Sequence, residues 1–327
     1  MMMTASRHLR LPILLLGAVT LCQPPAQAQQ DMESARARGQ VALTYDFKSR
    51  VPQREVPAMV ATARSVAQVI LATPDLANPV GVALNGGIHS SGVGSGMPST
   101  DPHAASGSII LRRINLPLKR KVDAQGRFEG EGEGPTIQVS INNLYFLAGN
   151  SPPVANGDYY YLPTNIASER GIMRFEDRGW DIIVIHKPGV LPFAFLTREE
   201  LLSRAMKSLN PDNPNLDEKR RLRIQEKYDA LRSELSKLSP AQRMEPGCEN
   251  GRIGKQWSRS GCDVPGATYL VRYNPKYFTP GASRTDAQII SLRVRRAWSG
   301  GDEMLGGRVR SAFQQIDLRA LQAMLKH

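Results

Sequence analysis

The chain has 327 residues, and 42 basic against 30 acidic side chains give it a formal net charge of +12 at pH 7. Beyond the N-terminus no window approaches the roughly 20 apolar residues of a membrane helix, which excludes a mature chain that spans a bilayer. The positive charge favours acidic partners, and the length suits one large domain or two ordinary ones.

The first residues are built like a cleaved secretory signal. Arg7 and Arg10 are followed by an apolar run from Leu11 to Leu21, and Ala26-Gln27-Ala28 supplies the small residues of a cleavage site. We therefore expect a signal peptide over residues 1–28, with cleavage near Ala28. The mature chain is then exported to the periplasm or the extracellular space.

The cysteines also give information about the type of signal and the compartment. Cys22 follows the apolar run, so a lipoprotein signal is the alternative, although Leu21 is bulkier than the residue that such signals require. Simple cleavage removes Cys22 and leaves Cys248 and Cys262, which are expected to form a disulfide in an oxidising compartment.

Cleavage also removes two arginines, so a formal charge of about +10 remains on the mature chain. Partners that fit this charge are an anionic cell-wall polymer, lipid head groups, lipopolysaccharide or an envelope protein. Nucleic acid is not expected as a partner in that compartment. A basic exported protein that is merely soluble is the alternative interpretation of the charge.

The first half of the chain is rich in strand patterns. Residues 29–40 are polar and predict a disordered lead-in, after which apolar and polar residues alternate from Val41 to Phe47, as in a half-buried strand. Pro57 to Ala72 has apolar residues at helical spacing. Further strands are predicted at 109–118, 137–147, 159–161, 171–175 and 180–185.

Two segments of this half were considered as metal sites. Residues 85–107 are dominated by Gly, Ser and Pro and predict a long loop, in which His89 and His103 have too few acidic neighbours to bind a metal. Residues 126–134 carry three glutamates, but their spacing matches no calcium loop, so a solvated acidic turn is preferred. No metal and no cofactor are predicted.

The hydrophobic pattern changes from strand to helix at Thr197. Thr197 and Glu200 form a capping box, and a second box is predicted from Asn215 to Glu218. Apolar residues then recur at spacings of four and three, which predicts an antiparallel helical hairpin with the preceding helix. These residues are Ile224, Tyr228, Leu231, Leu235 and Leu238.

Strands are predicted again at 268–273 and 287–297. In the second of these, Arg293 and Arg295 lie on one face, and the opposite face is apolar, with Ile290, Leu292 and Val294.

A terminal helix is predicted over 309–325, and the order of elements predicts an α+β protein. Residues 41–196 form a strand-rich region, and residues 197–327 add a helical hairpin insertion, a disulfide loop, two strands and a C-terminal helix. The two regions form either separate domains or one.

Three motifs lie between Trp180 and Leu292: FLTREEL at 195–201, YNPKYF at 273–278 and RTDAQ at 284–288. Together they resemble a set that recurs in secreted bacterial proteins of unassigned function. The resemblance implies no catalytic residue. It implies that some motif residues cluster at the start of the first hairpin helix, either to bind a ligand or as turn and core residues. These are Arg198, Asn274, Tyr277, Phe278, Arg284 and Gln288.

The most distinctive candidate surface lies between the two cysteines. Arg252, Lys255 and Arg259 flank Trp257, and the disulfide would present these cations and the flat ring with less ordering entropy to lose on binding. Such a loop suits an anionic glycan. In the alternative, Trp257 folds back onto a small core and the charges are solvated. The ligand surface would then comprise Arg198, Asn274 and Arg284.

No reaction centre is recognisable in the sequence. The mature chain has four histidines and lacks the serine-hydrolase and zinc-protease motifs. Asp181 and His186 are five residues apart on one predicted strand and therefore point to opposite faces. We expect a secreted or periplasmic, non-enzymatic binding or interaction protein that recognises an anionic envelope component. The alternatives are a hydrolase of an envelope polymer and a structural partner that joins an envelope assembly through the hairpin.

Overall fold

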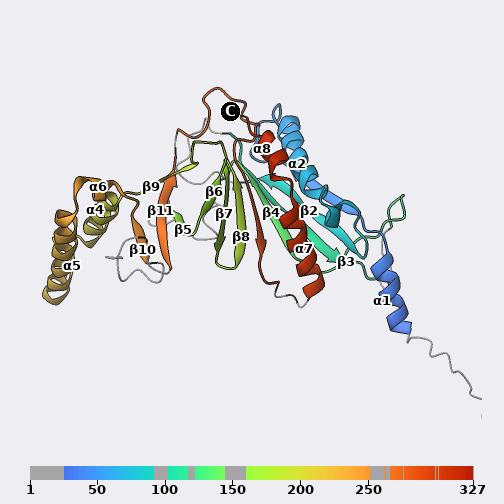
Figure 1. Ribbon diagram of the computed structural model, residues 1–327, viewed down its shortest axis with the longest axis horizontal. Helices are drawn as coiled ribbons and strands as arrows, with labels where there is room; N and C mark the ends of the chain where they lie inside the picture. Colours follow the sequence, from blue (N-terminus) through green and yellow to red (C-terminus); the bar gives the residue numbers. More distant parts are fainter. Residues whose placement is uncertain are drawn as a thin grey trace, which may run out of the picture.

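The computed structural model describes residues 26–91, 102–116, 122–143, 160–250, 262, 266–274, 276–298, 300 and 302–326. A large sheet with helices on one face forms the body of the molecule, a smaller sheet lies beside it, and a helical hairpin projects at the far end (Figure 1). The protein is α+β, as the sequence predicts. None of the described helices is long and apolar enough to cross a membrane.

The large sheet has eight strands in the order β1-β2-β3-β4-β12-β8-β7-β6. Strand β1 is parallel to β2, and every other pair is antiparallel. The strands are β1 (Val41–Asp46), β2 (Val82–Ser90), β3 (Ala105–Arg113), β4 (Thr136–Ile141), β6 (Ala167–Glu169), β7 (Ile172–Asp177), β8 (Trp180–Ile185) and β12 (Ile290–Arg295).

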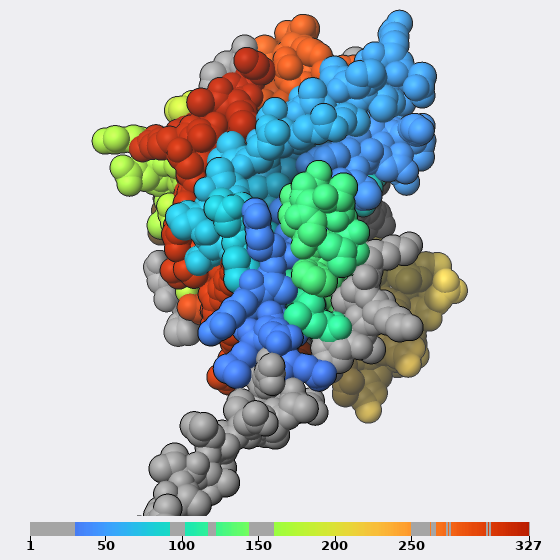
Figure 2. All heavy atoms as spheres, turned by 90° about the vertical axis from the view of Figure 1, so that its right-hand side faces the viewer, coloured from blue at the N-terminus to red at the C-terminus, as the bar shows by residue number. Residues whose placement is uncertain are grey.

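Helices cover one face of this sheet. They are α2 (Val56–Leu71), the short α3 (Pro74–Ala77), α7 (Glu303–Gln315) and α8 (Leu318–Ala323). Figure 2 shows α2 in light blue beside the red C-terminal helices. The alternation along the strands sends one apolar set toward these helices, where full burial of each side chain stabilises the fold by roughly 1.5–3 kcal/mol. Its members include Leu84, Ile109, Ile137, Ile183 and Leu292.

The opposite face is covered at one end by a second sheet. Strands β10 (Cys248–Asn250), β11 (Ala267–Tyr273) and β5 (Tyr160–Pro163) form it, and β9 (Phe193–Phe195) also pairs with β11. Side chains of β7 and β8 meet those of the second sheet in an apolar cluster that includes Phe175, Ile182, Leu162, Phe193 and Val271. Over β1 to β4 and β12 the same face carries many polar side chains.

The regions 41–196 and 197–327 share one core. Strand β12 lies between β4 and β8, and α7 and α8 pack on strands of the first region. This arrangement supports the single-domain alternative for the body of the protein.

The predicted hairpin consists of α4 (Arg198–Leu209) and α5 (Glu218–Lys237), followed by the short α6 (Pro240–Met244). Thr197 caps α4 in the predicted capping box. Leu231 of α5 is buried in a small core with Leu202 and Ala205 of α4. The two cysteines beyond the hairpin are bonded, with Cα atoms of Cys248 and Cys262 5.2 Å apart, within the usual range.

Helix boundaries differ from the prediction in three places. Residues 29–36, expected to be an unstructured lead-in, belong to the helix α1 (Ala26–Arg36). Helix α5 is capped by Asp217 rather than Asn215, because the Asp217 carboxylate accepts the Arg220 amide at 2.8 Å. The single predicted terminal helix is two helices, since Asp317 caps α8.

The segment 85–107, predicted as one loop, is strand at both ends, because β2 extends to Ser90 and β3 begins at Ala105. A Cβ on Gly107 would lie 1.9 Å from the carbonyl oxygen of Gly87 on the paired strand. These glycines therefore allow close contact between strands, whereas the composition of the segment was interpreted as a loop.

Candidate functional site

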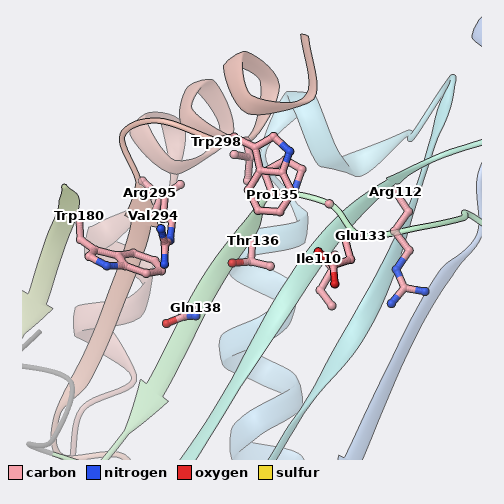
Figure 3. A pocket seen from close by; sticks show the side chains of 12 residues that line it. Ile110, Arg112, Glu133, Pro135, Thr136, Gln138, Trp180, Val294, Arg295 and Trp298 are labelled. Atoms are coloured by element: carbon pink, nitrogen blue, oxygen red, sulfur yellow. The ribbon is translucent and has the colours of Figure 1, made fainter. Parts of the chain in front are cut away.

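A groove opens where β12 ends and β4 and β8 begin, on the part of the sheet that carries polar side chains (Figure 3). Its cavity volume is about 480 Å³, within the range of small-molecule sites. Side chains that give the groove its chemistry are Arg112, Glu133, Gln138, Trp180, Arg295 and Trp298.

Strand alternation explains why these side chains meet. On β12, Leu292 and Val294 belong to the core beneath the helices, so Arg293 and Arg295 face the other side. Gln138 of β4 is the register partner of Arg293, and Trp180 of β8 is the partner of Arg295. Three strands from separate parts of the chain thus deliver the arginines, the amide and the aromatic ring to one place.

Trp180 holds both arginines of β12. The guanidinium carbon of Arg293 lies 4.6 Å from the centre of the Trp180 ring, and that of Arg295 lies 4.9 Å from it. Such cation–π contacts contribute roughly 0.5–2 kcal/mol, depending on exposure. Arg293 is 5% exposed and donates from Nε to Gln138 Oε1, whereas Arg295 is exposed. The stacked Arg295 guanidinium therefore keeps N–H groups available to an incoming anion.

Arg112 and Trp298 also line the groove. Arg112 extends from β3, and its Nε is buried without a hydrogen-bond partner among the described residues. Trp298 lies beside Pro135 in Figure 3 and supplies an apolar surface. The groove thus combines guanidinium donors with flat apolar faces, which suits a ligand that has an anionic group on a ring.

Carboxyl groups adjoin the groove but do not form a catalytic pair within it. Glu133 is the residue with a carboxylate among the described lining residues, and its side chain is exposed. Asp177 is the register partner of Trp180, and burial raises its pKa, although the Arg293 cation opposes this shift. Hydrolysis of a glycosidic bond requires two carboxyl groups that flank the bond, and the described lining supplies one.

The loop predicted as the main ligand surface cannot be compared with this groove. Arg252, Lys255, Trp257 and Arg259 lie outside the described residues. The disulfide that closes the loop is present, but the role of the loop itself stays a prediction.

The second predicted surface is divided between distant parts of the fold. Arg198 Nη1 lies 3.2 Å from Glu245 Oε2 in the hairpin lobe, and Asn274 donates to the Leu191 carbonyl oxygen at 2.9 Å. The Arg284 carbonyl oxygen accepts the amide of His103, in the segment that leads into β3. Arg198, Asn274 and Arg284 therefore each contact a different part of the chain, and their shared role as a ligand surface stays a prediction.

The motif residues instead hold a buried lysine. Lys187 is 8% exposed, and its Nζ donates to the Tyr277 carbonyl oxygen at 3.0 Å and to Gln288 Oε1 at 2.8 Å, with Thr279 Oγ1 as a third acceptor. Tyr277 OH donates to the Gln288 carbonyl oxygen at 2.6 Å. Burial lowers the pKa of Lys187 and raises that of Tyr277. We name Lys187, Tyr277, Thr279 and Gln288 the Lys187 clasp. Tyr277 belongs to the YNPKYF motif and Gln288 to the RTDAQ motif, so these two motifs have a structural role.

His186 and His103 are engaged in structural contacts. His186 Nδ1 lies 2.8 Å from the Lys187 carbonyl oxygen, and Asp181 pairs with Arg296, so the two do not interact, as strand geometry predicts. His103 Nε2 lies 2.6 Å from Glu55 Oε2 at the start of α2. Within the described ranges no group of three His, Cys, Asp or Glu side chains could hold a metal ion.

Comparison of the chain with protein-family models, with curated proteins and with solved structures finds no match.

Proposed function

We propose that the chain is an exported binding protein that recognises an anionic ligand, and that the groove is its binding site. The observation that carries the proposal is the stack of Arg295 on Trp180, in a groove that Arg112 lines from the other side of β4. Trp180 restricts the Arg295 side chain before a ligand arrives, so less conformational entropy is lost on binding. A guanidinium that is already oriented can form paired hydrogen bonds with a carboxylate or a phosphate.

The net positive charge and the expected exported location support the same function. The excess of basic side chains attracts anions over the whole surface, and the groove adds directed donors. The expected signal over residues 1–28 would deliver the chain to an oxidising compartment, where the bond between Cys248 and Cys262 is stable. An anionic component of the cell envelope is the ligand that this location offers.

The two alternatives receive less support. A hydrolase of an envelope polymer would need a second carboxyl group opposite Glu133 in the groove. An assembly role for the hairpin would need an apolar outer surface. On α5 the exposed large apolar side chain is Leu222, while Leu231 is buried against α4.

Affinity for an immobilised acidic polysaccharide tests the proposal. Charge-assisted hydrogen bonds contribute about 1.5–3 kcal/mol each, so Arg112→Ala combined with Arg295→Ala should raise the Kd by roughly tenfold or more. Arg223→Ala on the exposed side of α5 removes the same kind of charge far from the groove and should have little effect. An equal loss in both proteins, or no loss in either, would show that the groove is not the binding site.

A further inference from the structure

The polar face of the large sheet continues beyond the groove toward the edge strand β1. Arg293, Gln138, Ser108, Gly87 and Thr44 are successive register partners on β12, β4, β3, β2 and β1. Neighbouring strands are about 4.8 Å apart, so this row crosses roughly 19 Å of sheet. We name it the polar row.

A second row runs beside the first. Its members are again successive register partners from β12 to β1: Ser291, Ser140, Ser106, His89 and Asp46. Hydroxyl groups and an amide thus dominate the surface between the two rows. The alternate side chains of the same strands form the apolar core under the helices, so the two rows lie on the opposite face of the sheet.

Exposure differs along the rows. Arg293 and Ser140 are buried, Gln138 and Ser108 are half-buried, Gly87 is buried again, and Thr44 is exposed. The polar row is therefore most accessible at Thr44, at the open edge of the sheet, and partly accessible at Ser108 and Gln138.

Polar atoms on this face lack hydrogen-bond partners among the described residues. Ser291 is 4% exposed and its Oγ is unpartnered, and so is Oδ1 of Asn85. Asn85 is the register partner of Ile110, which lines the groove. Buried polar groups are nearly always paired, so these two atoms are unusual, but both are inaccessible to a ligand in the described structure.

We propose that the anionic ligand is an acidic glycan strand, with one acidic sugar in the groove and the following sugars on the polar row toward β1. This inference rests on the proposed function and specifies its ligand. Hydroxyl and amide side chains match the hydroxyl groups of sugars, and Gln138, Ser108 and Thr44 supply them along the row. A peptide would need pockets for alternate side chains, and single-stranded nucleic acid would need successive aromatic platforms. The described row supplies neither.

The dependence of affinity on ligand length tests this inference. The Kd of the mature chain would be measured for monomeric galacturonate and for oligogalacturonates of increasing length. Each added sugar that reaches the row forms new hydrogen bonds, so the Kd should fall by roughly tenfold or more between the shortest and longest ligands. Ser108→Leu should leave the Kd of the monomer unchanged and remove most of the gain with length.

Thr44→Leu, on the exposed end of the row, provides a second test if Ser108→Leu does not fold. Ser233→Leu on exposed α5 is the matched control and should keep the full length dependence. Equal affinity of the unmodified protein for monomer and oligomers would overturn the inference and leave the groove as the site. No binding of any acidic sugar would overturn the proposed ligand class in the groove as well. If a polyglutamate peptide bound as tightly as the oligogalacturonate, the ligand of the row would be a peptide and the glycan proposal would be wrong.

Discussion

Arg295 and Trp180 occupy opposite positions on the paired strands β12 and β8, and the guanidinium carbon of Arg295 lies 4.9 Å from the centre of the Trp180 ring. The contact fixes an exposed cation beside a groove that Trp298 and Arg112 also line. Neither residue marks a site in the sequence. The pairing of two distant strands creates the feature on which the functional proposal depends.

The Lys187 clasp should be important for stability. Lys187→Met would remove the Lys187 donor from the Tyr277 carbonyl oxygen and from Thr279 Oγ1, and would leave Gln288 Oε1 with the Thr279 amide alone. A buried acceptor without a donor costs about 1–3 kcal/mol. We expect the free energy of unfolding to fall by roughly 3 kcal/mol, as measured by urea denaturation. The exposed residue Lys276 provides a control. Lys276→Met should change the free energy of unfolding by less than about 0.5 kcal/mol. Equal effects would show that the clasp is not a stabilising element.

The hairpin should depend on its internal core. Leu231 is 7% exposed, and Leu231→Ala should destabilise the packing of α5 on α4 by about 2–5 kcal/mol. Leu222 is 59% exposed on the same helix, so Leu222→Ala should cost far less. Hydrogen exchange of the α4 and α5 amides reports on this lobe directly. Similar exchange in both variants would mean that the stripe on α5 does not hold the hairpin together.

The disulfide should be formed in protein that is isolated without reductant. Cys248 and Cys262 are 14 residues apart, and closing a loop of this size is expected to stabilise the fold by roughly 3 kcal/mol in the chain-entropy description. Alkylation without reduction should therefore leave the mass of the mature chain unchanged, while reduction first should add two alkyl groups. Two reactive thiols in the unreduced protein would contradict the bond.

Acid should remove the contribution of Glu55. The hydrogen bond from His103 is the main reason that the pKa of Glu55 lies below its ordinary value of 4.5. A carboxyl group with a lowered pKa stabilises the folded state above the unfolded value, and this stabilisation is lost as the pH falls toward the folded value. Glu55→Gln should therefore lower the Tm at neutral pH, and the difference should shrink below about pH 4.5. If the difference in Tm between the two proteins stayed constant down to about pH 3, the ionisation of Glu55 would not contribute to stability.

Local patterns were sufficient to predict much of the fold. Alternation located most strands, and the capping box fixed the start of α4 at Thr197, because both signals depend on residues close in sequence. The failures also have local causes. Asn215 and Asp217 both fit an N-cap, and glycines that allow β2 and β3 to approach each other resemble those of a loop.

The groove could not be predicted in the same way. The sequence placed Arg293 and Arg295 on the polar face of a strand, but it did not show that β12 lies between β4 and β8. Without that order, neither Gln138 nor Trp180 could be assigned to these arginines. The prediction therefore favoured the loop around Trp257, where cations and an aromatic ring are neighbours in sequence.

Intrinsic fluorescence distinguishes the groove from that loop most directly, because the chain has three tryptophans and two of them, Trp180 and Trp298, line the groove. The mature chain and the variants Trp257→Phe and Trp298→Phe would be titrated with an acidic oligosaccharide. We predict that the emission change on binding persists in Trp257→Phe and is much reduced in Trp298→Phe. A change that disappears with Trp257→Phe and is complete in Trp298→Phe would place the ligand on the loop and contradict the groove as the binding site.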